Sequence, residues 1–553
     1  MKIKMKTRLL FVISLLFTIC LSVVCGLEFS KPTYKVSAES TSIEMVSGAS
    51  VRLVANDPGL RFMASISKEE YNTVKNANGT FYMFILPNSY RENAEINEEN
   101  TFGENAVYCW GTAQAGKTQI VRCSANELTQ TSEDGNTYYF ACSLTSIKTQ
   151  NYELDFFARA YYEVDGVRTW APLNENNVRS VSYVAQKALG DANYTPTESG
   201  KTALVEYVTQ FAEVNETAGQ ASLYVADLAN VASIAVDGEA ATYTNTDGKA
   251  VLSNLTKGRH TATVTHNDGS TWDVPFVYAD YVIRNFADVL GLVDYYTEND
   301  TNTNAATITL SNKYIAVANN VVCEATDFVY PSTITSVNLS GSTFDGYGHA
   351  LKGLYIGQGC TGLLGHLTNA TVKDLALVDL VLNNTSKTQG LCGNISNTSK
   401  VENVFISGYA VTLNKDNVSL LAGEIKGTIE NCVVIDNSYA YNKGTSKNVH
   451  RAVLGKMKAD TTDAKLTNVI LKTVASNYAL CTGNTTNNVD ASLNDDRVEN
   501  LTRVGHTDNA SLKTALATFA SLVDGEGNKV NNFTYDAATY TLYLNGNAIY
   551  TVA

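Results

Sequence analysis

The sequence predicts a mainly β protein that ends in a parallel β-helix. Three observations lead to this prediction. Short apolar runs alternate with turn residues along most of the chain, charged residues make up only 17% of the 553 residues, and one short motif recurs at regular spacing in the second half. Asn, Thr and Ser fill the polar positions instead, as on the turn-rich surfaces of all-β proteins. The length fits three or four domains.

Residues 1–38 are expected to be a secretory signal peptide. A basic start, MKIKMKTR, precedes the 19-residue apolar run LLFVISLLFTICLSVVCGL. The run also approaches the length of a membrane anchor, but the small residues 36–38 before Glu39 favour cleavage. No later apolar run is long enough to span a bilayer. We therefore expect a secreted or cell-surface protein with no membrane span after signal removal.

Residues 44–212 are expected to form a β-rich N-terminal domain with helices. Strand-like runs such as TFYMFILP and TYYFACSL fill its first part, and two helices are expected over 176–192 and 199–214. The segments GASVRL…PGLRF and ARAYYEVDG resemble an N-terminal module of secreted proteins from anaerobic gut-type bacteria. The resemblance implies no active residues.

Residues 218–279 are expected to form a small Ig-like β-sandwich. The segment alternates apolar and polar residues, and Asp-Gly turns interrupt it about every ten residues. The stretch LSNLTKGRHTATVT resembles surface-exposed Ig-like spacer modules. Such a module sets distance or geometry more often than it carries chemistry.

One short motif recurs four times in the second half of the chain. Apolar residues occupy its first, fourth and sixth positions, and the copies span 372–377, 401–406, 429–434 and 466–471. A second element precedes each copy and ends in a glycine. These glycines are Gly365, Gly393, Gly423 and Gly455, at spacings of 28, 30 and 32 residues. A repeat of this length is typical of a solenoid, in which stacking completes the core.

Residues 281–553 are therefore expected to form a right-handed parallel β-helix with caps. Positions four and six point to one side of a strand, and the glycines mark tight corners. The third position of the motif is expected to stack as a hydrogen-bonded ladder of side chains, which are Asp374, Asn403, Asn431 and Asn468. A helix over 281–296 is expected to cover the first coil. A helix over 511–523 and a hairpin over 531–552 are expected to close the last one.

The order FDGYGHALKGL…GLLGHL resembles the GLUG-motif proteins, whose repeats occur in bacterial surface proteins and in some secreted peptidases. The resemblance implies a parallel β-helix, but it gives little information about function. The zinc-peptidase motif HExxH is absent from this sequence.

Charge and cysteine usage exclude several classes of partner. The net charge is −14, and it becomes −19 without residues 1–38, which hold six Lys or Arg and one Glu. Nucleic acid would be repelled. No CxxC or Cys/His spacing appears among the eight later cysteines, so neither a metal site nor a cofactor is expected. Most of these cysteines are expected to be small buried hydrophobes, although a secreted setting also permits disulfides.

The sequence does not decide whether the chain is an enzyme, but more of its features indicate a protein without catalysis. Asp345, Asp374 and Glu402 are carboxylates in the repeats, and Asp345 and Asp374 are the candidates for a catalytic pair, although Asp374 occupies a ladder position. The repeats carry a single Arg, Arg451, so the basic groove of a uronic-acid lyase is absent. His349 and His366, about one coil apart, are expected to be solvated corner residues.

The binding hypothesis rests on aromatic residues, because flat rings stack on sugar faces. The candidates, all in the N-terminal domain, are Trp110, Trp170, Tyr161 and Tyr162. We therefore expect a recognition or adhesion protein that binds a polysaccharide or a surface protein. A carbohydrate-active enzyme on the β-helix and a purely structural surface-display protein are the alternatives.

Overall fold

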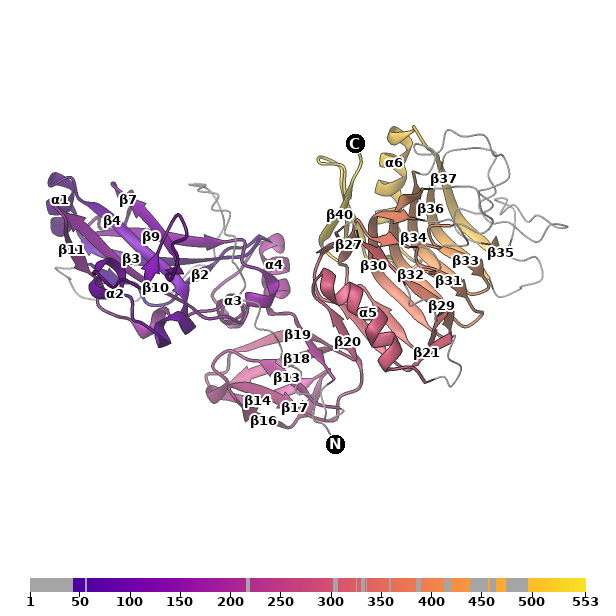
Figure 1. The fold of residues 1–553 in the computed structure, drawn as a ribbon, viewed down its shortest axis with the longest axis horizontal. Coiled ribbons are helices and arrows are strands. Elements are labelled where there is room, and N and C mark those ends of the chain that lie inside the picture. The colour runs from indigo at the N-terminus through magenta and orange to yellow at the C-terminus, as the bar shows by residue number, and fades with distance from the viewer. Residues whose placement is uncertain are drawn as a thin grey trace.

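A computed structural model describes residues 43–54, 57–214, 219–301, 307–324, 326–329, 334, 336–357, 360–383, 389–411, 419–437, 456–457, 464–473 and 496–553 (Figure 1). The mainly β prediction is confirmed, with 48% strand and 17% helix. The expected signal peptide, residues 1–38, and the glycine element at 452–455 lie outside the described residues.

The front domain is a sandwich of two antiparallel sheets. One sheet has the order β1-β3-β9-β8, with β2 also paired to β3, and the other has the order β11-β10-β4-β7. The strands are β1 (Glu44–Met45), β2 (Ser50–Val51), β3 (Gly59–Ser67), β4 (Thr80–Pro87), β7 (Val121–Ala125), β8 (Gln130–Thr131), β9 (Thr137–Thr145), β10 (Phe156–Val164) and β11 (Val167–Trp170). The short strands β5 (Tyr108–Cys109) and β6 (Thr118–Gln119) pair with each other. A disulfide between Cys123 and Cys142 joins β7 to β9, and so links the two sheets.

Four helices accompany this sandwich, namely α1 (Lys68–Asn76), α2 (Glu98–Phe102), α3 (Val181–Gly190) and α4 (Glu198–Val208). Side-chain caps start each one; Ser67, for example, accepts from the main-chain N–H of Glu70 at the start of α1. The helix expected over 199–214 ends at Val208, because residues 210–213 form the strand β12 (Gln210–Glu213). This strand pairs in parallel with β19 of the next unit and ties the two units together.

The second unit is a small β-sandwich. Its sheets have the orders β12-β19-β18-β14-β15 and β13-β17-β16. The strands are β13 (Ala221–Tyr224), β14 (Val231–Val236), β15 (Glu239–Ala241), β16 (Tyr243–Thr246), β17 (Lys249–Leu252), β18 (Gly258–His266) and β19 (Thr271–Ala279). Gln186 of α3 accepts from the indole N–H of buried Trp272 at 3.1 Å, so the front domain also packs on this sandwich through α3.

The third unit is a β-solenoid, as the sequence predicts. It has about four turns, and short strands extend its sheets at both ends. One wall has the path β20-β22-β26-β30-β32-β34-β36-β37, and the other is β21-β25-β29-β31-β33-β35. The first wall contains β20 (Tyr281–Ile283), β22 (Tyr314–Val317), β26 (Thr343–Asp345), β30 (Thr371–Leu382), β32 (Lys400–Ala410), β34 (Thr428–Asp436), β36 (Lys465–Thr473) and β37 (Val498–Gly505). Four short strands belong to the same sheet but lie outside this order, namely β23 (Val321–Val322), β24 (Asp327–Phe328), β27 (Ala350–Lys352) and β28 (Tyr355–Ile356). The second contains β21 (Thr307–Ser311), β25 (Ser336–Ser340), β29 (Leu364–Thr368), β31 (Cys392–Ile395), β33 (Ala422–Ile425) and β35 (Lys456–Met457).

The repeated glycines serve close packing between coils rather than tight corners. Gly365, Gly393 and Gly423 lie inside strands β29, β31 and β33. A Cβ on Gly365 would stand 1.3 Å from the carbonyl oxygen of Val337 in the coil before it. The corner role expected for these glycines is wrong, because the neighbouring backbone takes the space that a side chain would need.

The two ends of the solenoid are covered differently from each other. Helix α5 (Phe286–Glu298) covers the first end, where Val289, Leu292 and Tyr296 join the interior apolar core. Near the other end, α6 (Asn509–Ala520) packs on β36 and β37. The hairpin strands β38 (Phe533–Asp536), β39 (Thr541–Leu544) and β40 (Asn547–Thr551) turn back, and β39 and β40 pack on β30. The hairpin thus lies along the side of the solenoid, and does not close its last coil as expected.

The expected ladder residues share an unusual backbone conformation. Asp374, Asn403, Asn431 and Asn468 have φ of 51°, 51°, 52° and 52° at matching places in consecutive strands. Asn500 continues the series with φ of 55°. Asn and Asp tolerate this left-handed region better than other residues with a side chain. The repeated Asn is therefore explained by backbone conformation as well as by side-chain bonding.

The side-chain bonds of this series change along the solenoid. Asn500 donates to Asn468 at 3.1 Å, and Asn468 donates to Asn431 at 2.9 Å. At Asp374 and Asn403 the structure differs from the expected stack. There Asn532 donates its side-chain amide to Asp374 at 2.7 Å and its main-chain N–H to Asn403 at 3.3 Å. At these two positions the ladder residues therefore bond to the segment that leads into the C-terminal hairpin.

Candidate functional site

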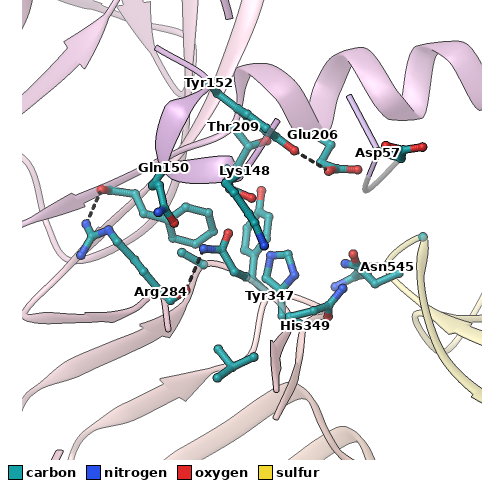
Figure 2. Close-up of a pocket in the computed structure, with 18 of the residues that line it drawn as sticks. Asp57, Lys148, Gln150, Tyr152, Glu206, Thr209, Arg284, Tyr347, His349 and Asn545 are labelled. Carbon is teal, nitrogen blue, oxygen red and sulfur yellow. Dashed lines mark hydrogen bonds between the residues drawn. The ribbon is translucent and has the colours of Figure 1, made fainter. Parts of the chain in front are cut away.

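A cleft of about 1080 Å³ opens between the front domain and the first turns of the solenoid (Figure 2). On one side it is lined by residues of α4 and of the loop 146–152. On the other side it is lined by the solenoid segment 318–322 and by Tyr347 and His349. The tip of the C-terminal hairpin, 545–547, lies at its edge. Parts of the chain far apart in sequence thus build one site.

Two glycines bring Tyr347 and His349 into this cleft. Both residues lie in the short turn after β26, in the sequence DGYGH. A Cβ on Gly346 would stand 2.3 Å from the carbonyl oxygen of Asp374. Gly348 has φ of +88°, and its Cβ would stand 2.6 Å from the Cβ of Asn545. The turn needs glycine at both positions because backbone and hairpin approach so closely.

Aromatic rings form part of the cleft wall. Phe211 meets the Tyr347 ring nearly at right angles, with ring centres 5.2 Å apart. The guanidinium of Arg259 lies 4.8 Å from the centre of the same Tyr347 ring. Both rings remain partly exposed and both line the cleft.

His349 is a buried, uncharged imidazole. It is only 9% exposed, and its Nδ1 has no hydrogen-bond partner. Burial lowers the pKa of His349 to about 4, although the charge of Asp345 acts in the opposite direction. The solvated position expected for His349 is wrong. His366 lies in β29 and does not line the cleft.

A second polar atom in the cleft also has no partner. The side-chain oxygen of Asn319 is buried and accepts no hydrogen bond, while its amide nitrogen donates to the carbonyl of Arg284 at 2.9 Å. Burying an unpaired polar atom costs about 1–3 kcal/mol. The residues that carry these two atoms, Asn319 and His349, both line the cleft.

Several of the charged side chains that line the cleft are paired or hydrogen-bonded within the protein. Arg284 pairs with Glu213 at 3.1 Å. Asp57 pairs with Arg52 and accepts from the hydroxyl of Ser146 at 2.9 Å. The carboxylate of Glu206 accepts a hydrogen bond from Tyr152 at 3.1 Å, and Figure 2 shows this contact beside the cleft.

The candidate catalytic carboxylates lie outside the cleft. Asp345 and Asp374 are 0% and 2% exposed, and both bind Arg259 of β18. The Nε of Arg259 donates to Asp345 at 2.6 Å, and its Nη2 lies 2.5 Å from Asp374. Burial opposes ionisation, but the bonds and charge of Arg259 outweigh it and lower the pKa of Asp345. The two residues come together as the anchor for Arg259, with no access for a substrate.

The candidate aromatic residues of the front domain do not form one surface. Tyr161 is fully buried, with the rings of Tyr82 and Trp170 at 4.9 and 4.6 Å. Trp110 and Trp170 belong to the same half-buried cluster. Tyr162 belongs to a different core cluster, where its hydroxyl donates to Glu70. None of these four candidates lines the cleft.

Sequence reasoning missed most of the residues that line the cleft, and it named His349 only as a solvated corner residue. Tyr347 and His349 lie in the glycine-rich stretch that the repeat pattern singles out, and an aromatic residue between two glycines was the available signal. Phe211 and Asn545 carry no local signal, because only the folded chain brings them to the site.

The described ranges contain no group of three or more His, Cys, Asp or Glu side chains that would hold a metal ion. None of the helices in those ranges has the length and apolar character needed to cross a membrane. Comparisons with protein-family models, curated proteins and solved structures give no match.

Proposed function

We propose that this chain is a secreted or surface-exposed bacterial recognition protein that acts without catalysis. It binds a glycan or a surface protein in the cleft between the front domain and the solenoid, and so serves adhesion. In this proposal the solenoid is of the GLUG type, and the small β-sandwich is an Ig-like spacer that holds the two walls of the cleft apart.

The observation that carries the proposal is the composition of the cleft. It combines partly exposed rings with two buried polar atoms, on Asn319 and His349, that have no protein partner. Binding sites are typically apolar clefts with a few well-placed polar groups. A ligand that bonds these two atoms would remove an existing energetic cost.

The positions of the carboxylates that the sequence offered as catalytic candidates favour binding over catalysis. Hydrolysis of a glycosidic bond needs two carboxyl groups that flank it, about 5–9.5 Å apart. Asp345 and Asp374 are buried against Arg259, and Asp57 is engaged by Arg52. A carbohydrate-active enzyme remains the alternative that the test below separates.

The disulfide supports the secreted location. Cys123 and Cys142 are bonded across the two sheets of the front domain. Disulfides persist in oxidising surroundings outside the cytosol.

Affinity electrophoresis of the full chain, through native gels cast with a panel of polysaccharides, tests the proposal. Val322 lines the cleft and is 75% exposed, so Val322→Trp fills the site without disturbing a core. Val167 is 69% exposed, lies in the front domain away from the cleft lining, and gives the matched control Val167→Trp.

We expect at least one polymer to retard the chain and to remain intact under the band. Val322→Trp should abolish the retardation and Val167→Trp should keep it. A cleared zone in the stained polymer would establish an enzyme. Free migration through every polymer would contradict glycan recognition and favour surface display.

A further inference from the structure

The apolar part of the cleft is a wall of rings and aliphatic side chains. Tyr347 and Phe211 lie together, and Val205 and Val322 line the cleft as exposed aliphatic residues. Val322 is 75% exposed, so its side chain is accessible to a ligand in the cleft. The apolar faces of sugar rings pack on such surfaces.

The polar side chains of the cleft are suited to bind hydroxyl groups. The free oxygen of Asn319 accepts only, so it needs an O–H or N–H donor. A neutral imidazole such as His349 carries one donor and one acceptor nitrogen. A hydroxyl group serves both residues, because it donates and accepts. Amides of Asn545, Asn547 and Gln150 add further partners of the same kind.

The charges in the cleft leave no excess of either sign. Arg259 and Arg284 are held by carboxylates of the protein, as is Asp57 by Arg52. The remaining charged side chains of the lining are two cations, Lys148 and Lys201, and two anions, Glu198 and Glu206. The chain as a whole carries a net charge of −14, which repels polyanions at long range.

The volume is large enough for at least a drug-sized ligand. Sites for drug-sized ligands span about 300–1,000 Å³, and this cleft has about 1080 Å³. Its lining also extends from the loop 146–152 to the hairpin tip 545–547.

Resting on the proposed function, we infer that the cleft binds an uncharged saccharide chain, with sugar rings on Tyr347 and Phe211 and hydroxyl groups on Asn319 and His349. The same lining disfavours uronic-acid polymers and other acidic chains, because it offers them no excess of positive charge.

The test compares polysaccharides that differ only in charge. Glucan, mannan, xylan and galactan are each used in a neutral hydroxyethylated form and in a carboxymethylated form. The full chain, Val322→Trp and Val167→Trp are run in affinity gels at 20 and 500 mM NaCl. The dissociation constant is obtained from retardation against polymer concentration.

We expect a neutral polymer to bind at least tenfold more tightly than its carboxymethylated form. The affinity for it should change less than twofold between the two salt concentrations. Val322→Trp should lose this binding, and Val167→Trp should keep it. Asn319→Ser, which shortens the side chain that carries the free acceptor, should weaken binding at least tenfold.

The opposite results separate this inference from the proposed function. Binding of a carboxymethylated form alone, lost at 500 mM NaCl and in Val322→Trp, would overturn the uncharged ligand but keep the cleft as the recognition site. Binding that Val322→Trp leaves intact would overturn the assignment of the cleft itself. Retention by no polymer would overturn both this inference and the glycan form of the proposed function.

Discussion

At the residue scale, Arg259 is the side chain that joins the small β-sandwich to the solenoid. It projects from β18 onto Asp345 and Asp374, which are both fully buried. The Nζ of Lys373 lies farther from Asp345, at 3.7 Å, and so does not take the place of the Arg259 guanidinium. Without Arg259, two carboxylates would lie in the interior with too little compensating charge.

We predict that Arg259→Met lowers the free energy of unfolding of the solenoid by about 3 kcal/mol, because breaking a buried ion pair strands its partner. The matched control is Lys352→Met, since Lys352 pairs with Asp379 at 3.9 Å and both side chains are exposed. That change should cost about 0–1 kcal/mol. Urea unfolding measures both, and equal effects would show that Arg259 is not an anchor.

His349 makes stability depend on pH. Burial lowers its pKa from 6.5 to about 4, against the opposing charge of Asp345. Between these values the unfolded chain binds a proton at His349 and the folded chain does not. Stability therefore falls as the pH drops from about 6.5 toward 4.

We predict that His349→Gln loses less stability than the natural chain between pH 7 and pH 5, by on the order of 2 kcal/mol. The difference between the two chains isolates His349 from the other histidines. Thermal unfolding at both pH values provides the measurement. Parallel losses in the two chains would mean that His349 is solvated.

At the element scale, the strands of the solenoid follow from the repeated apolar positions. The copies at 372–377, 401–406, 429–434 and 466–471 all lie in strands of one wall. The end of the second helix was not predictable in the same way. Residues 210–213 continue a helical pattern, but they pair with β19, which lies much later in the chain.

The helix and the hairpin that cover the solenoid show the same limit of prediction from local sequence. The helix at the first end was predictable from its own amphipathic pattern, but its expected start at residue 281 is wrong. Residues 281–283 form β20, and the helix begins after a capping box of Asn285 and Asp288. The place of the C-terminal hairpin was not predictable from the sequence, because it depends on apolar residues such as Phe405 that point outward from the solenoid. Local pattern predicts an element, whereas the packing partner decides where it lies.

We predict that Gly365→Ala destabilises the solenoid by more than about 3 kcal/mol, because the new Cβ overlaps the backbone of Val337 and β29 must move away from β25. Gly525→Ala is the matched control, since a Cβ there meets nothing within 4 Å. Urea unfolding compares the two. A small, equal effect would mean that the coils do not approach as closely as described.

At the scale of the whole molecule, three units meet through specific contacts. Trp272 and Gln186 join the front domain to the small sandwich, and Arg284 pairs with Glu213 near the start of the solenoid. The cleft lies where these units meet, because its lining combines residues of all three. That is why the sequence predicts the solenoid but not the site, whose residues come from all three units.

Hydrogen–deuterium exchange of the full chain, with and without the polysaccharide that retards it, tests the recognition cleft most directly. We predict slower exchange in four segments that line the cleft, 146–152, 318–322, 346–349 and 545–547, and no change around Trp110 and Trp170. Protection confined to the front-domain aromatic cluster, or to solenoid strands away from the cleft, would contradict the assignment of the binding site.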